Sequence, residues 1–187
     1  MTTLTVLSPV SGQVLGLSEV ADPVFSAELV GPGLALDPPL AAGSEVISPI
    51  GGTIVKLHPH AFVVQHDDGR AVLVHLGIDT VELGGAGFTL HASEGAVVTA
   101  GQVVVSWDPS ALGGRSPVCP VVGLEAGADA LTRLARPGDI VAAGEPLLSW
   151  AWPFSRSPSR TSPARSSPPT SERTGSSCAP RSPPPGG

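Results

Sequence analysis

Two internal repeats constrain the fold more than any other feature of the sequence. Residues 8–17 match residues 48–57, and each segment opens with Ser-Pro before a glycine and a β-branched run. Residues 95–107 match residues 138–150, and each segment runs from a glycine to a Ser-Trp pair. Repetition at the scale of a few strands predicts a duplicated supersecondary unit, while pairs of repeats are too few for a solenoid.

Most of the remaining body consists of short β-branched runs separated by Gly or Pro, which is typical of an antiparallel β-sandwich or barrel. The Gly-x-x-Val-x-x-Gly segments that begin at Gly95 and Gly138 each predict a turn between two strands. One short helix is expected over residues 124–136, where apolar residues recur at helical spacing in Leu124, Ala128, Leu131 and Ala135.

The charged residues divide the chain into an acidic body and a basic tail. Residues 1–150 carry 15 acidic and 5 basic side chains, whereas residues 151–187 carry one Glu and five Arg among many Ser and Pro. We expect one domain over 1–150 and a disordered tail over 151–187, because the tail buries too little apolar surface to offset its ordering entropy. A functional anion-binding tail and translation in a shifted reading frame are the alternatives.

The acidic body argues against nucleic-acid binding and favours a basic protein partner. No apolar run approaches the roughly 18 residues of a membrane span, and no signal peptide opens the sequence. We therefore expect a cytoplasmic protein without direct membrane insertion. Cys119 lies in an apolar run and Cys178 in the tail, so a disulfide framework is not expected.

Residues 56–83 place two histidines in apolar runs on either side of an Asp-Asp-Gly turn signal, which predicts a β-hairpin. A two-residue loop puts His75 opposite Phe62, with His60 on the next diagonal, and a four-residue loop puts His60 directly opposite His75. Both registers bring the imidazoles to one face, about 5 Å or about 7 Å apart at Cβ. A three-residue loop would move one of them to the other face.

A histidine in a strand is usually a packed or solvated side chain, but the setting of His75 favours chemistry. Gly77 removes a side chain beside it and opens the surface above the imidazole. Two imidazoles on one face can share a proton, bind a metal, or act as a nucleophile and a donor to an incoming anion. His75 and His60 are therefore the candidate catalytic pair.

At these residues the sequence resembles the glucose-type enzyme IIA family of the bacterial phosphoenolpyruvate-dependent sugar phosphotransferase system. The similarity runs in order from about Leu4 to Trp150. The segments that carry it are Ser8-Pro9-Val10-Ser11-Gly12, Asp22-Pro23-Val24-Phe25, residues 30–36, residues 49–54, His60-Ala61-Phe62, Val74-His75-Leu76-Gly77-Ile78-Asp79-Thr80-Val81-Glu82-Leu83 and Pro120-Val121-Val122.

The resemblance implies an all-β fold, an antiparallel sandwich of the duplicated hybrid motif type. It implies that His75 accepts a phosphoryl group on Nε2 from the phosphocarrier protein HPr and passes it to a cysteine of a sugar-specific enzyme IIB or IIBC. His60 would hydrogen-bond the phosphate. The partner-facing positions of the family match Asp22, Phe25, Val30, Asp79 and Val81.

The resemblance further implies a regulatory role, in which the protein binds transporters or kinases according to its phosphorylation state. A zinc ion bridging His60, His75 and a partner carboxylate is one form of such a complex, and no other cofactor is implied. We expect a free-standing A component, because the sequence holds no enzyme IIB cysteine motif and no transmembrane C domain. The sugar stays open among glucose, N-acetylglucosamine and glucosides.

Two other classes of protein compete with this interpretation. A zinc metallopeptidase of the same fold uses H-x-x-x-D and H-x-H motifs, which residues 75–79 and 58–60 imitate in the reverse order. A lipoyl or biotin carrier needs a lysine at a hairpin tip, whereas Lys56, the only lysine of the chain, precedes a strand.

Overall fold

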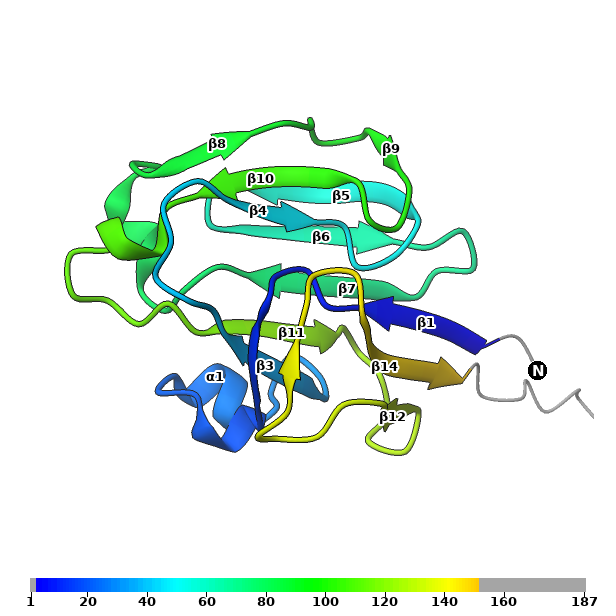
Figure 1. The fold of residues 1–187 in the computed structure, drawn as a ribbon. Helices are drawn as coiled ribbons and strands as arrows, with labels where there is room; N and C mark the ends of the chain where they lie inside the picture. The colour runs from blue at the N-terminus through cyan, green and yellow to red at the C-terminus, as the bar shows by residue number, and fades with distance from the viewer. Residues whose placement is uncertain (1–2, 152–187) are drawn as a thin grey trace, which may run out of the picture. The chain divides into compact units, whose positions relative to one another are not determined.

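Antiparallel strand pairing organises the computed structural model, which describes residues 3–151 (Figure 1). The predicted tail lies outside the described residues except for Ala151, which ends the last strand. The strands are β1 (Thr3–Leu7), β2 (Gly12–Leu15), β3 (Gly33–Asp37), β4 (Ser44–Ile47), β5 (Gly52–His58), β6 (Ala61–Gln65), β7 (Ala71–His75), β8 (Phe88–Leu90), β9 (Val97–Val98), β10 (Val103–Trp107), β11 (Cys119–Gly123), β12 (Leu131–Arg133), β13 (Ile140–Val141) and β14 (Pro146–Ala151). The helical elements are α1 (Pro23–Ser26) and the 3₁₀ turns η1 (Leu17–Glu19), η2 (Thr80–Leu83) and η3 (Pro109–Ala111).

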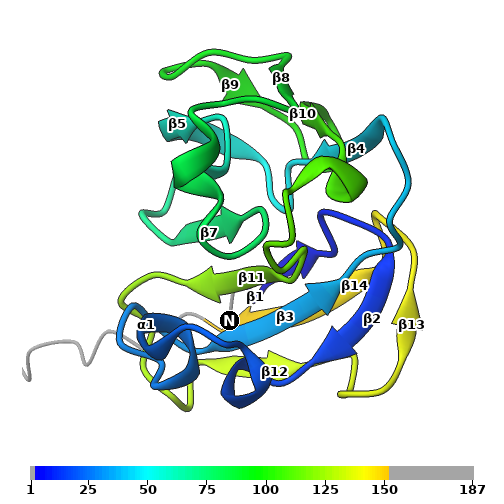
Figure 2. The same cartoon turned by 90° about the vertical axis from the view of Figure 1, so that its left-hand side faces the viewer.

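The strands form one large sheet and two small ones, as expected for an antiparallel sandwich. The large sheet has the order β13-β2-β3-β11-β7-β6-β5-β9, and the small sheets have the orders β1-β14-β12 and β4-β10-β8. Each small sheet packs over one half of the large sheet (Figure 2). Their inner faces share one apolar core, in which Trp107 and Phe62 are the largest fully buried side chains. No helix within residues 3–151 is long and apolar enough to cross a membrane.

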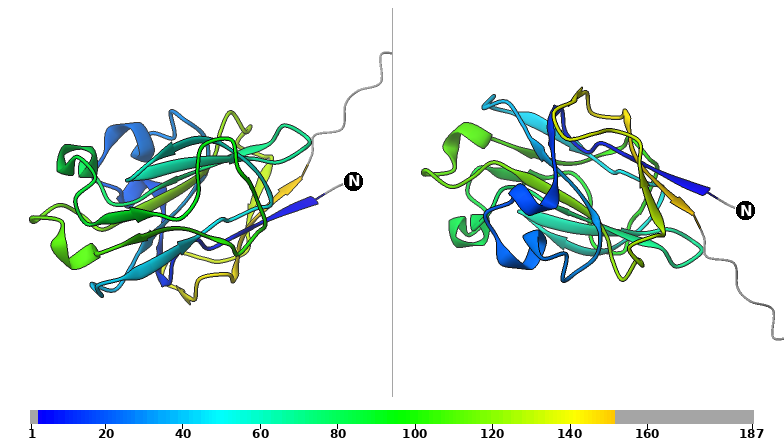
Figure 3. Two further views of the ribbon diagram at one scale, coloured as in Figure 1. Left: turned by 90° about the horizontal axis from the view of Figure 1, so that it is seen from above. Right: turned by 90° about the horizontal axis from the view of Figure 1, so that it is seen from below.

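Matching hydrogen bonds in the two halves confirm the predicted duplication. Ser8 and Ser48 are both fully buried, and each hydroxyl donates to the carbonyl two residues later at 2.7 Å. The second repeat also binds both serines in the same way, because the amides of Gly101 and Gly144 donate to the carbonyls of Ser48 and Ser8 at 2.9 Å. Figure 3 shows the paired strands β1 (blue) and β14 (gold) lying side by side.

The prediction of a helix over residues 124–136 is wrong. Turns follow β11, Glu125 adopts a left-handed conformation with φ 56°, and the chain then enters strand β12. Here β12 pairs with β14, opposite Leu148 to Trp150. The helical spacing of the apolar residues is overridden because β12 satisfies the backbone groups on the otherwise unpaired edge of β14. The α-helix of the described residues is α1 instead.

The predicted hairpin forms from β6 and β7 with a three-residue loop. The His66 amide donates to the Arg70 carbonyl at 2.8 Å, which leaves Asp67, Asp68 and Gly69 as the loop, and Gly69 has φ 94°. Arg70 is buried, and its guanidinium donates to the Asp68 carboxylate and to the Trp150 carbonyl. The Arg70 bonds lower the pKa of Asp68 to about 2. This buried cation ties the hairpin to β14.

The close approach of β3 and β11 gives a test of the register. A Cβ added to Gly33 would lie 2.1 Å from the Val121 carbonyl oxygen and 2.9 Å from the Val122 Cα. We expect Gly33→Ala to lower the free energy of unfolding by about 2 kcal/mol or more, because both contacts are backbone atoms of the paired strand. Urea unfolding measures this change.

Gly127→Ala is the matched control, since a Cβ there meets nothing within 4 Å. It should change the free energy of unfolding by less than about 0.5 kcal/mol. Equal stability of the two variants would contradict the pairing of Gly33 with Val122.

Candidate functional site

The two candidate histidines meet where β7 ends and the turn between β5 and β6 begins. His75 is the last residue of β7, and His60 follows Pro59 in the turn. Their ring centroids are 5.3 Å apart with an interplanar angle of 61°. The His60 carbonyl accepts a hydrogen bond from the Leu76 amide at 2.7 Å, which holds the two segments together. The structure therefore brings the two predicted imidazoles together.

The strand register differs from both predicted alternatives. His75 stands opposite Ala61, not opposite Phe62 or His60, and this is the pairing of a three-residue loop. Strict alternation would then turn His60 to the face opposite His75. His60 escapes alternation because it lies in the two-residue turn of the neighbouring hairpin, where His58 pairs with Ala61. The expectation that a three-residue loop separates the imidazoles is wrong for this reason.

A backbone carbonyl sets the orientation of the His75 ring. His75 Nδ1 lies 2.7 Å from the Gly77 oxygen. A carbonyl oxygen only accepts, so Nδ1 carries the proton in this bond and the Nε2 lone pair of the neutral ring is free to act as a nucleophile. Burial lowers the pKa of His75, while the bond to Gly77 and the charges of Asp22 and Asp79 raise it.

Gly77 is required for a reason other than the one expected from the sequence. It is buried and has φ 74°, a left-handed conformation that L side chains rarely adopt. An added Cβ would lie 2.6 Å from Thr80 Cγ2 and 2.9 Å from the Ser116 oxygen. The glycine therefore does not open the surface above His75. It lets the backbone turn tightly enough to point its carbonyl back at the imidazole.

Four aromatic rings form a row through the site. Phe25 contacts the His75 ring edge-on at 5.4 Å, and on the other side His58 stacks on His60 at 5.8 Å with an interplanar angle of 16°. The short helix that carries Phe25 begins at Asp22, whose carboxylate accepts hydrogen bonds from the Val24 and Phe25 amides. Phe25 is only 6% exposed, so it is mainly a core residue that supports His75.

The surroundings of His60 favour its neutral form. Burial lowers its pKa, and the neighbouring His75 and His58 lower it further because adjacent imidazolium ions would repel. The site thus presents one imidazole with a free Nε2 and a second imidazole able to donate or accept a hydrogen bond beside it. This arrangement suits the transient binding of a small anion on a histidine nitrogen.

Comparison with known proteins assigns the family. A family model described as "phosphoenolpyruvate-dependent sugar phosphotransferase system, EIIA 1" matches residues 4–128. The chain belongs to this EIIA family. It is therefore a phosphotransferase component, a phosphocarrier that takes part in sugar uptake through a histidine. The two histidines lie within the matched residues.

Related EIIA proteins occur both alone and fused to other domains. The chain is 37% identical over 123 residues to a "PTS system glucose-specific EIIA component" of Oceanobacillus iheyensis, covering 64% of this chain and 73% of the relative. It is 42% identical over 120 residues to a "PTS system N-acetylglucosamine-specific EIICBA component" of Escherichia coli, covering 62% of this chain and 18% of the relative. The fused relatives show that EIIA works with a sugar-specific enzyme II.

A solved structure supports the same fold. The glucose permease IIA from Mycoplasma capricolum superposes with a TM-score of 0.71 at 29% sequence identity, covering 80% of this chain and 96% of that chain. Neither this match nor the sequence relatives support the metallopeptidase alternative.

The predicted partner-facing residues occupy different settings. Asp22 and Asp79 lie close enough to His75 for their charges to raise its pKa. Val81 projects from η2 with 62% of its surface exposed. Val30 is half-buried and lines a separate groove of about 700 Å³ beside β5, β6 and β7.

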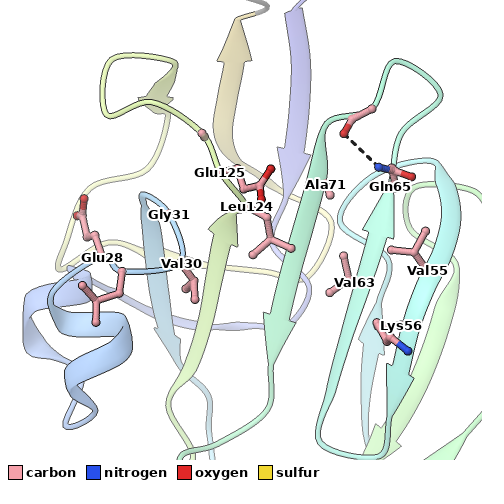
Figure 4. Close-up of a pocket in the computed structure, with 13 residues that line it drawn as sticks. Glu28, Val30, Gly31, Val55, Lys56, Val63, Gln65, Ala71, Leu124 and Glu125 are labelled. Carbon is pink, nitrogen blue, oxygen red and sulfur yellow. Dashed lines mark hydrogen bonds between the residues drawn. The ribbon is translucent and has the colours of Figure 1, made fainter.

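That groove combines an apolar floor with charged edges (Figure 4). Apolar side chains from three parts of the chain line it, namely Val30, Val55, Val63, Ala71 and Leu124. Glu28 and Glu125 lie on the side of the turns, and Lys56 lies on the side of β5. Apolar area ringed by polar groups is a common composition for a protein interface.

The sequence analysis did not predict a role for Arg115. This residue lies 40 positions after His75 in the sequence, but it contacts the segment that follows His75. Its guanidinium donates to the Asp79 carbonyl at 3.1 Å and to the Glu82 carboxylate at 2.7 Å. The signal that was present is its rarity, because residues 1–150 hold only five basic side chains.

The lowered histidine pKa values predict a pH dependence. Both rings are neutral in the folded protein at pH values where the unfolded chain, with histidine pKa near 6.5, already binds protons. The free energy of unfolding is therefore expected to fall as the pH drops below 6.5. In ¹⁵N-edited NMR, His75 should show the Nδ1–H tautomer and titrate below pH 6.5. An Nε2–H tautomer would contradict the bond to Gly77.

Proposed function

We propose that His75 is the phosphoryl acceptor, that Nε2 is the reacting atom, and that phospho-HPr is the donor. The observation that supports this most is the hydrogen bond between His75 Nδ1 and the Gly77 oxygen. It fixes the ring so that Nε2 is the only ring nitrogen with a free lone pair. The acceptor of the next step is a cysteine of a sugar-specific enzyme IIB, alone or within IIBC.

The transfer needs no change in the protonation of His75 Nδ1. As the new bond from His75 Nε2 to phosphorus forms, the bond from phosphorus to the donor histidine breaks, and the electron pair stays on the donor ring. The proton stays on Nδ1, and its hydrogen bond to the Gly77 oxygen stabilises the positive charge that develops on the His75 ring. Such a reaction depends on in-line positioning and charge stabilisation more than on covalent help.

His60 is the residue that hydrogen-bonds the phosphoryl group in this proposal. Its ring faces His75 at 5.3 Å between centroids, and stacking on His58 limits its rotation. The lowered pKa of His60 favours the neutral ring, which already carries one N–H donor. An incoming phosphoryl dianion favours a second proton on His60.

The docking face for HPr and enzyme IIB combines Asp22, Asp79 and Val81 near the histidines with Val30 in the groove. The acidic body, with 15 acidic and 5 basic side chains over residues 1–150, steers a basic partner toward it. Phe25 contributes from beneath, through its contact with His75, more than through exposed surface.

Regulation and metal binding remain predictions from the resemblance, and a cytoplasmic location remains a prediction from the sequence. Within residues 3–151, no group of three or more His, Cys, Asp or Glu side chains is placed to hold a metal. A regulatory zinc at His60 and His75 would need further ligands from a partner, such as a carboxylate of a bound transporter or kinase. A cytoplasmic location also fits the proposed partners. Among the relatives, the named sugars are glucose, mannose and N-acetylglucosamine.

A phosphotransfer assay tests the roles of the two histidines. The protein is incubated with phosphoenolpyruvate, enzyme I and HPr, and its intact mass is measured. Wild type should gain one phosphoryl group, and His75→Ala should gain none. His60→Gln should accept the group but fail to pass it to an enzyme IIB, because the hydrogen bond that stabilises the transferring phosphate is weakened.

His91→Ala is the matched control, since His91 bonds Ser106 on another sheet and lies outside the row of rings. It should behave as wild type. Phosphate uptake by His75→Ala, or its loss in His91→Ala, would overturn the assignment.

A further inference from the structure

The 3₁₀ turn η2 links the two histidine-bearing turns of the site. At one end, the segment that leads into η2 contains Gly77, whose carbonyl orients His75. At the other end, Gly85 packs against Pro59, the neighbour of His60, since a Cβ added to Gly85 would lie 3.3 Å from the Pro59 ring. A contact that holds η2 in place therefore also stabilises the surface between His75 and His60.

The turn itself is intrinsically weak. It has four residues, and short 3₁₀ turns have poorer hydrogen-bond geometry than α-helices. It is also flanked by Asp79 and Gly84, both in left-handed conformations, with φ 59° and 57°. A non-glycine residue in this region costs about 1 kcal/mol or more. Contacts from elsewhere must hold Asp79 in place.

Those contacts come from the loop after η3, which includes Arg115 and Ser116. The Ser116 carbonyl accepts from the Ile78 amide at 2.9 Å. Arg115 Nε donates to the Asp79 carbonyl at 3.1 Å, and Nη2 donates to the Glu82 carboxylate at 2.7 Å. The guanidinium thus contacts both Asp79, which precedes η2, and Glu82, which lies within it. Arg115 is 27% exposed, and a third bond to the Leu112 carbonyl at 3.3 Å anchors it in its own loop.

We propose that Arg115 is a positioning residue for the docking of the phosphoryl donor. It clamps η2 so that the exposed Val81 side chain and the Asp79 carboxylate are presented beside His75 before the partner arrives. Preset geometry lowers the ordering cost of association. Arg115 does not touch the reacting atoms, and the Gly77 carbonyl keeps its own support from the Ile78–Ser116 bond. The proposal rests on the proposed function, because it assumes that the donor docks at this rim.

We expect Arg115→Gln to weaken the binding of phospho-HPr without slowing the phosphoryl transfer step. The Michaelis constant for phospho-HPr should rise roughly fivefold, the size expected for losing one or two partly exposed charge-assisted contacts. The turnover number should stay within about twofold, since the His75–Gly77 bond is retained. Arg115→Lys should fall between wild type and Arg115→Gln, because a lysine supplies one charge but not the fork that reaches both acceptors. Arg136→Gln is the matched control, with the same loss of charge at an exposed site away from η2.

A double-mutant cycle tests whether Arg115 acts through its contact with Glu82. If Arg115 acts through Glu82, then Glu82→Gln should weaken donor binding less than Arg115→Gln does, and adding it to Arg115→Gln should cost nothing more. Strictly additive effects would instead assign Glu82 its own contact with the donor and overturn the clamp.

Hydrogen exchange gives a readout that does not require a donor. Amides of residues 79–84 should exchange faster in Arg115→Gln than in wild type or Arg136→Gln, while the Ile78 amide keeps its bond to Ser116. Unchanged exchange, or faster exchange with an unchanged Michaelis constant, would overturn the positioning role. A wild-type protein that accepts no phosphoryl group from phospho-HPr would overturn the proposed function instead, and exchange would still report whether Arg115 holds η2.

Discussion

The hydrogen bond from His75 Nδ1 to the Gly77 carbonyl is the interaction on which the site depends. It requires the chain to reverse within two residues of a strand end, and this reversal requires a glycine with positive φ. The reversed segment is then enclosed on both sides. Thr80 donates its hydroxyl to the Leu76 carbonyl at 2.7 Å, and the Ile78 amide bonds Ser116 at 2.9 Å. The Nδ1 atom of His75 is oriented because the loop around its acceptor, the Gly77 carbonyl, is held in place by these bonds.

The scaffold provides this rigidity through burial on both sides of β7. Val72, Val74 and Leu76 point into the core and are fully buried, so the strand cannot slide without exposing them. On the opposite face, His75 meets Phe25, which the capped helix α1 delivers from a distant part of the chain. The His75 ring therefore sits between a buried strand and a capped short helix, which suits a reaction governed by positioning.

Sequence reasoning succeeded where a pattern is local and repeated. The duplication was visible because both halves reuse a Ser-Pro-x-x-Gly turn, and the hairpin was visible from its Asp-Gly signal. It failed where tertiary pairing decides. The apolar spacing over residues 124–136 fits a helix, but the free edge of β14 recruits a strand. The register of His75 was missed because His60 belongs to a turn, where the alternation of a strand does not apply. Arg115 was missed because nothing local relates it to η2.

The pairing of strands from opposite ends of the domain affects the order in which the protein can fold during synthesis. β1 pairs with β14, from Thr3 opposite Ala151 to Leu7 opposite Pro146, and β2 pairs with β13. During synthesis, β1 and β2 therefore wait for partner strands that are made much later. Pairing between such distant segments is slow and leaves apolar edges unprotected in the meantime. The hairpin of β6 and β7, which ends at His75, is built from neighbours in sequence and can form long before the domain that will hold it rigid is closed.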